Sequence, residues 1–260
     1  MSAFDTSWMI LTIVGVATAG GLIGLDRTAV GQFMVSQPIC AASLAGWMLG
    51  DAATGLLVGA LLELIWLLDM PVGTFVPADS TVAAVFAAAI AILGSTGGVR
   101  LSHVGLSILL SIVLAPITML ADHMVREFNA RIALRVQADS ATVMDSGLAG
   151  AHLSGLWPFF FKSFFVYLVF IPLGIIAVRL FARMPDQYHR AMELYVKLLP
   201  LLGVALVARK LSIRTFDQFL FGGFIVALAA ALVFPASMPM IILLTAVGGL
   251  LGANYLDQRA

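Results

Sequence analysis

Long apolar runs, broken only by short polar segments, follow one another along this chain of 260 residues. Apolar residue types make up 61% of the sequence and charged residues 11%, whereas an ordinary soluble domain has roughly 25% charged residues. The mean hydropathy is +1.05. A chain of this kind needs the bilayer as its solvent, and the runs are long enough for about eight or nine helices of roughly 20 residues. We therefore predict an all-α, polytopic integral membrane protein.

Charge is distributed unevenly along the chain, although the formal net charge is zero. Residues 1–99 contain six acids and a single base, Arg27, whereas the remainder contains thirteen bases and eight acids. We predict one membrane domain over residues 1–260. Within it, residues 1–100 form an acidic half that handles a polar solute, and residues 154–260 form a C-terminal membrane half.

Residues 122–150 have a different pattern from the apolar span before them. Val125, Phe128 and Ile132 recur at helical spacing, with basic residues on other faces. The pattern predicts an amphipathic connecting helix, either solvated or lying on acidic lipid.

Further along, Lys162 is near the start of an apolar run and is predicted to extend its ammonium group to the surface.

Three carboxylates occur within or beside the apolar stretch from Leu61 to Asp79. Glu63 lies within the run, Asp69 ends it, and Asp79 follows a segment that is broken by two prolines and a glycine. An ionisable group in hydrocarbon is costly, so each is a functional-site candidate that faces water or the protein interior. This stretch is the predicted position of a polar site.

The apolar runs on either side of this segment, 55–68 and 81–93, are too short to cross a hydrocarbon core of ~30 Å as upright helices. Irregular backbone at membrane depth is tolerated only beside a cavity or within protein. We therefore predict short re-entrant or broken helices around a polar site at the membrane midplane.

The predicted solute-binding residues are Glu63, Asp79, Asp69, Asp26 and Trp66. Ionised carboxylates accept strong hydrogen bonds from hydroxyl groups, and an indole ring offers an apolar face. A structural role for the acids would need a buried basic partner, and the N-terminal third offers only Arg27. For Asp26, the alternative to solute binding is pairing with Arg27 or a position at an interface. For Asp51, the alternative is capping of the following helix.

Catalytic and metal-binding patterns are missing from the sequence. There is no His-Glu-x-x-His, and Met48-Leu49-Gly50-Asp51 lacks the first glycine of the Gly-x-Gly-Asp pattern of intramembrane aspartyl proteases. The four histidines, which lack metal-ligand spacing, are expected in solvated or capping positions; they are His103, His123, His152 and His189. We expect no catalytic residue, no metal and no cofactor.

Several short motifs in the N-terminal part resemble one bacterial family. They are Gly24-Leu25-Asp26, Gln37-Pro38, the run from Gly46 to Asp51 with Thr54-Gly55, the segment from Gly59 to Glu63, and the segment from Gly73 to Asp79. In order and spacing they resemble the IIC permease component of the mannose/fructose/sorbose family of the phosphoenolpyruvate-dependent phosphotransferase system. The resemblance is clear over about residues 8–95 and looser beyond Leu101, and Ala78 stands where the family commonly has proline.

The resemblance implies a sugar-translocating permease subunit that is not itself catalytic. It implies a hexose substrate, a IID membrane subunit, cytosolic IIA and IIB phosphocarrier proteins, and thus a hetero-oligomer in the bacterial inner membrane. Contact with the lipid bilayer is expected and contact with nucleic acid is not. Two other functions remain open at this point: an ion-coupled transporter that acts alone, and a regulatory or orphan relative that has lost transport.

Overall fold

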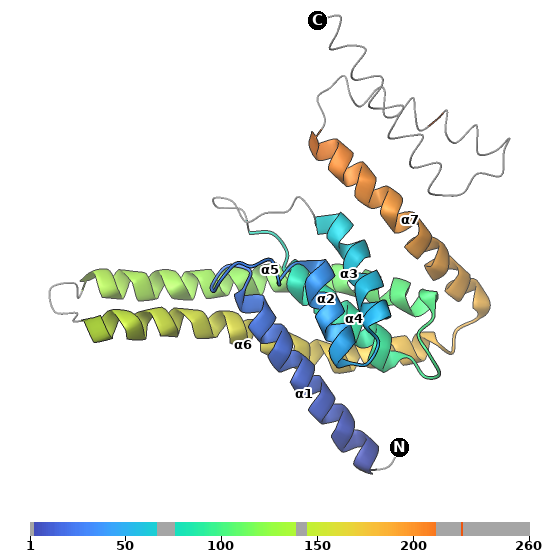
Figure 1. Ribbon diagram of the computed structural model, residues 1–260, viewed down its shortest axis with the longest axis horizontal. Coiled ribbons are helices and arrows are strands. Elements are labelled where there is room, and N and C mark those ends of the chain that lie inside the picture. The colour runs from blue at the N-terminus through green and yellow to red at the C-terminus, as the bar shows by residue number, and fades with distance from the viewer. Residues whose placement is uncertain (1–2, 67–75, 139–144, 212–224, 226–260) are drawn as a thin grey trace, which may run out of the picture. The chain divides into compact units, whose positions relative to one another are not determined.

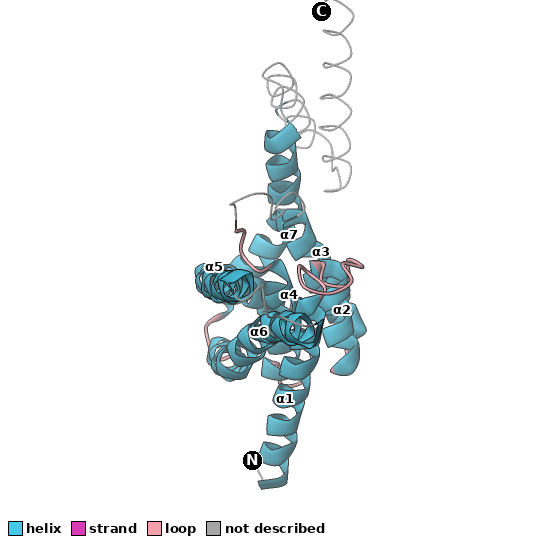
Figure 2. Ribbon diagram, turned by 90° about the vertical axis from the view of Figure 1, so that its left-hand side faces the viewer, coloured by secondary structure: helices cyan, strands magenta, loops and turns pink. Residues whose placement is uncertain are grey.

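In the computed structural model of the protein, residues 3–66, 76–138, 145–211 and 225 are described. The described residues form seven α-helices, and none of them is in a strand (Figures 1 and 2). The helices are α1 (Ala3–Leu25), α2 (Pro38–Met48), α3 (Ala52–Trp66), α4 (Ser80–Gly94), α5 (Leu101–Ala138), α6 (Asp145–Phe181) and α7 (Asp186–Leu211). The predicted all-α class is confirmed.

Three of these helices are long and apolar enough to cross a membrane: Ser7–Leu25, Leu101–Gln137 and Gly150–Phe181. Their most apolar windows are only 28–39% buried within the protein, so much of their apolar surface is left for lipid or for other subunits. The chain divides into two compact units, residues 1–198 and 199–260. The prediction of one membrane domain over residues 1–260 stays a prediction.

Helices α5 and α6 pack against each other and have 38 and 37 residues, respectively (Figure 1). At 1.5 Å per residue each is about 56 Å long, well beyond a hydrocarbon core of ~30 Å. The structure differs here from the expected connecting helix over 122–150, because that stretch belongs to α5 as far as Ala138 and to α6 from Asp145. The apolar residues of the first part of this stretch keep the helical spacing because α5 continues unbroken from Leu101 to Ala138. Pro116 lies inside α5 and does not end it.

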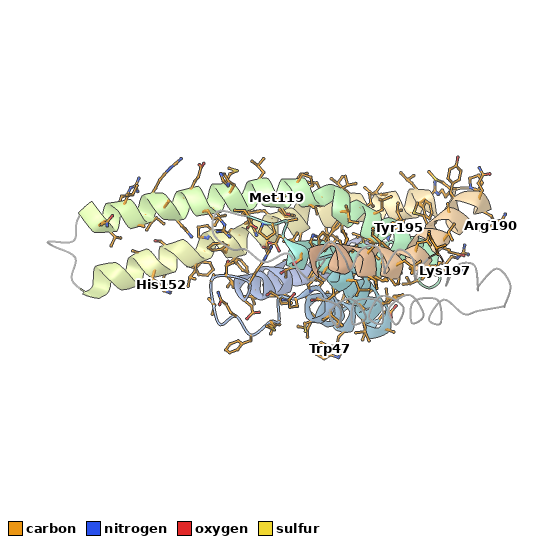
Figure 3. The ribbon with its side chains drawn as sticks, turned by 90° about the horizontal axis from the view of Figure 1, so that it is seen from above. Trp47, Met119, His152, Arg190, Tyr195 and Lys197 are labelled. Carbon is orange, nitrogen blue, oxygen red and sulfur yellow. The ribbon has the colours of Figure 1, made fainter. Side chains whose placement is uncertain are left out.

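Helices α2 and α3 form a close pair that begins at Pro38, in the first turn of α2. A Cβ atom on Gly46 would lie 2.6 Å from the backbone oxygen of Asp51 and 2.8 Å from the Cα atom of Gly55, so the two backbones touch. Small residues allow such an approach. On the outer side of α2, Trp47 points away from the protein and is 72% exposed (Figure 3).

Helix α4 is the core of the first unit. It has 15 residues, of which twelve are buried, and it packs against α2, α3, α5, α6 and α1. The predicted short run at 81–93 is thus a helix enclosed by protein, which satisfies the requirement that a short helix at membrane depth be shielded from lipid. Buried charged side chains gather at the N-terminus of α4.

Candidate functional site

Asp79 caps the N-terminus of α4 and is 2% exposed. Its Oδ1 atom accepts a hydrogen bond from the backbone N–H of Val82 at 3.1 Å, and its own N–H donates to Oγ1 of Thr118 at 3.0 Å. An N-terminal carboxylate satisfies one of the free N–H groups of the helix and interacts favourably with the helix dipole. Asp79 is therefore needed for α4 to begin where it does.

Two basic side chains from distant parts of the sequence bind the same carboxylate. The Nη1 atom of Arg27, two residues after α1, lies 2.9 Å from Oδ1 of Asp79, and its Nη2 atom donates to the backbone oxygen of Ala78 at 2.8 Å. Lys162, in α6, donates from Nζ to Oδ2 of Asp79 and, at 2.6 Å, to Oδ1 of Asp122 in α5. We call these four residues, Arg27, Asp79, Asp122 and Lys162, the charged cluster.

The charged cluster joins α4, α5, α6 and the end of α1 through four side chains, none more than 14% exposed. Its two cations and two carboxylates give a formal charge of zero. Burying such groups is costly, and the cost is offset only while each charge keeps its partners. Ionisable groups inside a membrane protein mark functional sites by default, so the cluster is the first candidate for one.

The prediction that Lys162 reaches the surface was wrong, because its side chain is 7% exposed and ends between two carboxylates. Sequence reasoning also missed Asp122. One signal could have found both: each is an ionisable residue beside or within an apolar run, and the burial cost that was applied to the N-terminal acids applies equally to them. Asp79 thus has a second basic partner, Lys162, outside the N-terminal third.

Glu63, in α3, contacts the beginning of α2 rather than the charged cluster. Its Oε2 atom accepts a hydrogen bond from the backbone N–H of Ile39 at 3.1 Å. The side chain of Gln37, the N-cap residue of α2, makes no cap hydrogen bond, so Glu63 supplies an acceptor that the helix terminus lacks. Its side chain is half-buried, and within the described part of the chain no hydrogen bond or ion pair joins it to Asp79.

Asp26 stabilises the loop between α1 and α2. It accepts hydrogen bonds from the backbone N–H groups of Phe33 at 2.6 Å and Ser36 at 3.0 Å, and it does not pair with Arg27. Partial burial raises the pKa of the Asp26 carboxyl, but these hydrogen bonds outweigh that effect and lower the pKa below its usual value of 3.8. The backbone oxygen of Ser36 in turn accepts a bond from Oγ1 of Thr81 at 2.7 Å, which links this loop to the first turn of α4.

The remaining N-terminal candidates have simpler positions. Trp66 is the last residue of α3 and is half-buried, whereas Asp69 lies outside the described residues. Asp51 accepts hydrogen bonds from the backbone N–H and the hydroxyl of Thr54 at 3.0 and 2.6 Å, which confirms it as a cap of α3.

Two of the histidines are not solvated, contrary to expectation. His103 and His189 are 3% and 7% exposed, and their Nδ1 atoms lie 2.8 Å from Oγ of Ser95 and 3.1 Å from Oγ of Ser102. Both rings also pack against Phe181. Among the described residues no group of three or more His, Cys, Asp or Glu side chains is arranged to hold a metal ion.

A match to one protein family accounts for this architecture. Residues 7–252 match the model of the family described as "PTS system sorbose-specific iic component". The chain belongs to this family. The resemblance read from the N-terminal motifs is thereby confirmed, and the match extends through the C-terminal half, where the motifs alone were weak.

Curated relatives of this sugar-permease family agree with the assignment. The chain is 24% identical over 220 residues to "Fructose permease IIC component" of Bacillus subtilis (strain 168), covering 84% of this chain and 78% of the relative. It is 24% identical to "PTS system sorbose-specific EIIC component" of Klebsiella pneumoniae, with coverages of 83% and 79%. It is 25% identical over 234 residues to "PTS system mannose-specific EIIC component" of Escherichia coli (strain K12), with coverages of 85% and 80%.

A solved structure described as "Structure of membrane protein" has the same fold, with a TM-score of 0.67 at 20% identity and 95% coverage of both chains. The family match and the curated relatives identify the chain as a sugar-translocating membrane subunit of a phosphotransferase system.

Proposed function

We propose that this chain carries a hexose of the mannose, fructose and sorbose group across the bacterial inner membrane as a multi-pass IIC subunit. The observation that carries the proposal is the family match over residues 7–252, nearly the whole chain. In the proposal a IID membrane subunit completes the translocating complex, and cytosolic IIA and IIB proteins deliver the phosphoryl group. The chain contributes no catalytic residue and no cofactor.

The proposed solute-contacting residues are the carboxylates Glu63, Asp69 and Asp26, with Asp79 and the ring of Trp66. Their expected roles differ. Glu63 has one carboxylate oxygen bound to a backbone N–H, whereas its other oxygen has no partner among the described residues, which favours direct contact with a sugar hydroxyl. Asp79 already binds two cations, which favours a role in anchoring the segment that precedes α4.

Amide substitutions test this proposal. Glu63→Gln keeps the shape of the side chain and removes the charge, so it is expected to weaken charge-assisted bonds worth about 1.5–3 kcal/mol, or roughly 10- to 150-fold in affinity. The measurement is binding of radiolabelled mannose, fructose and sorbose, normalised to the amount of assembled complex. Asp51→Asn is the matched control, because Asp51 caps a helix and is expected to leave affinity unchanged.

Asp79→Asn separates anchoring from direct contact. If Asp79 anchors the segment before α4, this variant lowers the amount of assembled complex, and affinity per complex falls only through the altered segment. Normal sugar binding in both Glu63→Gln and Asp79→Asn would remove these carboxylates from the proposed site.

A further inference from the structure

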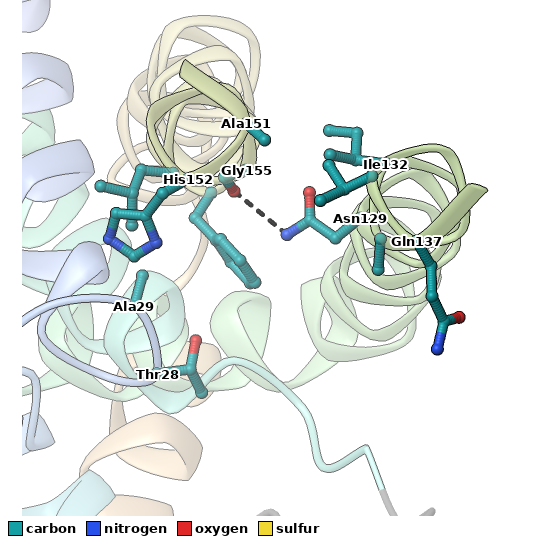
Figure 4. Close-up of a pocket in the computed structure, with 12 residues that line it drawn as sticks. Thr28, Ala29, Asn129, Ile132, Gln137, Ala151, His152 and Gly155 are labelled. Atoms are coloured by element: carbon teal, nitrogen blue, oxygen red, sulfur yellow. Dashed lines mark hydrogen bonds between the residues drawn. The ribbon is translucent and has the colours of Figure 1, made fainter. Parts of the chain in front are cut away.

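A groove with a volume of about 820 Å³ opens between the second half of α5 and the first half of α6 (Figure 4). The loop after α1 forms its floor through Thr28 and Ala29. No Lys, Arg, Asp or Glu is among the described residues that line it, and its polar side chains carry hydroxyl, amide and imidazole groups. Its volume is in the range of small-molecule sites, and its lining suits an uncharged ligand.

Asn129 supplies a hydrogen-bonding group in this groove that has no partner. Its Nδ2 atom donates to the backbone oxygen of Gly155 at 3.0 Å, which fixes the amide between the two helices (Figure 4). Its Oδ1 atom is buried and accepts no hydrogen bond from the described residues. A buried acceptor without a partner is uncommon in native proteins and indicates that something else satisfies it.

A complementary donor lies one turn away on the same helix. The Nε atom of Arg126 is also buried and has no hydrogen-bond partner in the part of the chain that the structure describes. Residues three apart share one face of a helix. Arg126 lines a small cavity beside the charged cluster, and Thr28 and Phe159 line both this cavity and the groove. The cavity and the groove are therefore neighbours, and Arg126 lies beside the groove without lining it.

We propose that this groove is a second sugar-binding site, distinct from the acidic segment at 61–79, with Asn129 as acceptor and Arg126 as donor. A hydroxyl group donates one hydrogen bond and accepts others, so a polyhydroxylated ligand satisfies both free groups at once. The ring of Phe159 offers an apolar face to the C–H groups of a sugar. The inference rests on the proposed function, since it assigns the groove to the same solute.

Protection from cysteine labelling tests this site in the complete complex. The sole native cysteine, Cys40, is first replaced by serine, and Ala133→Cys then places a thiol in the groove. Leu134→Cys is the matched control, because the adjacent Leu134 is 65% exposed and does not line the groove. Total binding of radiolabelled mannose, fructose and sorbose is measured on the same membranes by equilibrium dialysis.

At a sugar concentration ten times the measured Kd, maleimide labelling of the Ala133→Cys protein is expected to slow about tenfold, because about one site in eleven stays free. Labelling of the Leu134→Cys protein is expected to stay unchanged. Asn129→Leu removes the amide with its free Oδ1 atom, and Arg126→Lys replaces the guanidinium that carries the free Nε–H group. Each variant should raise the sugar concentration needed for protection about tenfold.

Sugar binding by dialysis without protection at Ala133→Cys would overturn the groove site and leave the proposed function standing. Absence of any sugar binding would overturn both. Protection by inorganic phosphate but not by sugar would show an anion site and refute the inference, as would unchanged protection in both Asn129→Leu and Arg126→Lys.

Discussion

Lys162→Met is expected to destabilise this protein strongly. Lys162 is 7% exposed and binds both Asp79 and Asp122, so its loss changes the charged cluster from two cations and two carboxylates to one cation and two carboxylates. Breaking a buried ion pair by removing one partner costs about 3–5 kcal/mol, because the other charge stays buried without compensation. This corresponds to roughly 150- to 5,000-fold in the unfolding equilibrium.

A second substitution shows whether charge balance is the cause. Lys162→Met combined with Asp122→Asn leaves one cation and one carboxylate, Arg27 and Asp79, which are 2.9 Å apart. We expect the double variant to be more stable than Lys162→Met alone, whereas additive losses of folding free energy would make it less stable. Lys162→Arg is the control that keeps the charge.

The assay measures the fraction of complex that stays folded in mild detergent as the temperature rises. It compares the wild type with Lys162→Met, Lys162→Arg, Asp122→Asn and the double variant. Stability of Lys162→Met equal to that of the wild type would refute the buried cluster. A double variant less stable than either single variant would refute charge balance as the cause.

Two further predictions concern the parts around the cluster. Gly46→Ala should destabilise the α2–α3 pair by about 1–3 kcal/mol and lower membrane abundance, because the new Cβ would lie 2.6 Å from the Asp51 backbone oxygen and 2.8 Å from the Gly55 Cα atom. Gly15→Ala is the control, because its Cβ would meet no described atom within 4 Å, and it should leave membrane abundance unchanged. Asp26 has a folded-state pKa below its unfolded value of 3.8, so its stabilising contribution is present above that value and is lost as pH falls through the folded pKa. Thermal stability of Asp26→Asn should therefore depend less on pH below about 5 than the wild type does, and identical pH profiles would contradict this.

The sequence predicted those features that depend on local patterns. The short apolar run at 81–93 became α4 (Ser80–Gly94), Pro38 began α2, and Asp51 capped α3, because length, backbone restriction and capping act over a few residues.

Features that depend on tertiary contacts were not predicted. Lys162 is 83 residues from Asp79 in the sequence, and no local pattern indicates that the two will meet. The cost of burying an ammonium group could have marked Lys162 as unusual, but its choice of partner follows from how α6 packs on α4. His103 and His189 were missed for the same reason: they occur at helix ends, which are usually wet, and here other helices cover them.

The most direct test of the proposed function is sugar uptake by cells that lack the chain and then regain it, together with the IIA, IIB and IID subunits. The proposed function predicts uptake of mannose, fructose or sorbose that requires phosphoenolpyruvate, yields the phosphorylated sugar inside, and continues after the proton gradient is collapsed. Uptake that follows the proton gradient, ignores phosphoenolpyruvate and delivers unmodified sugar would contradict it.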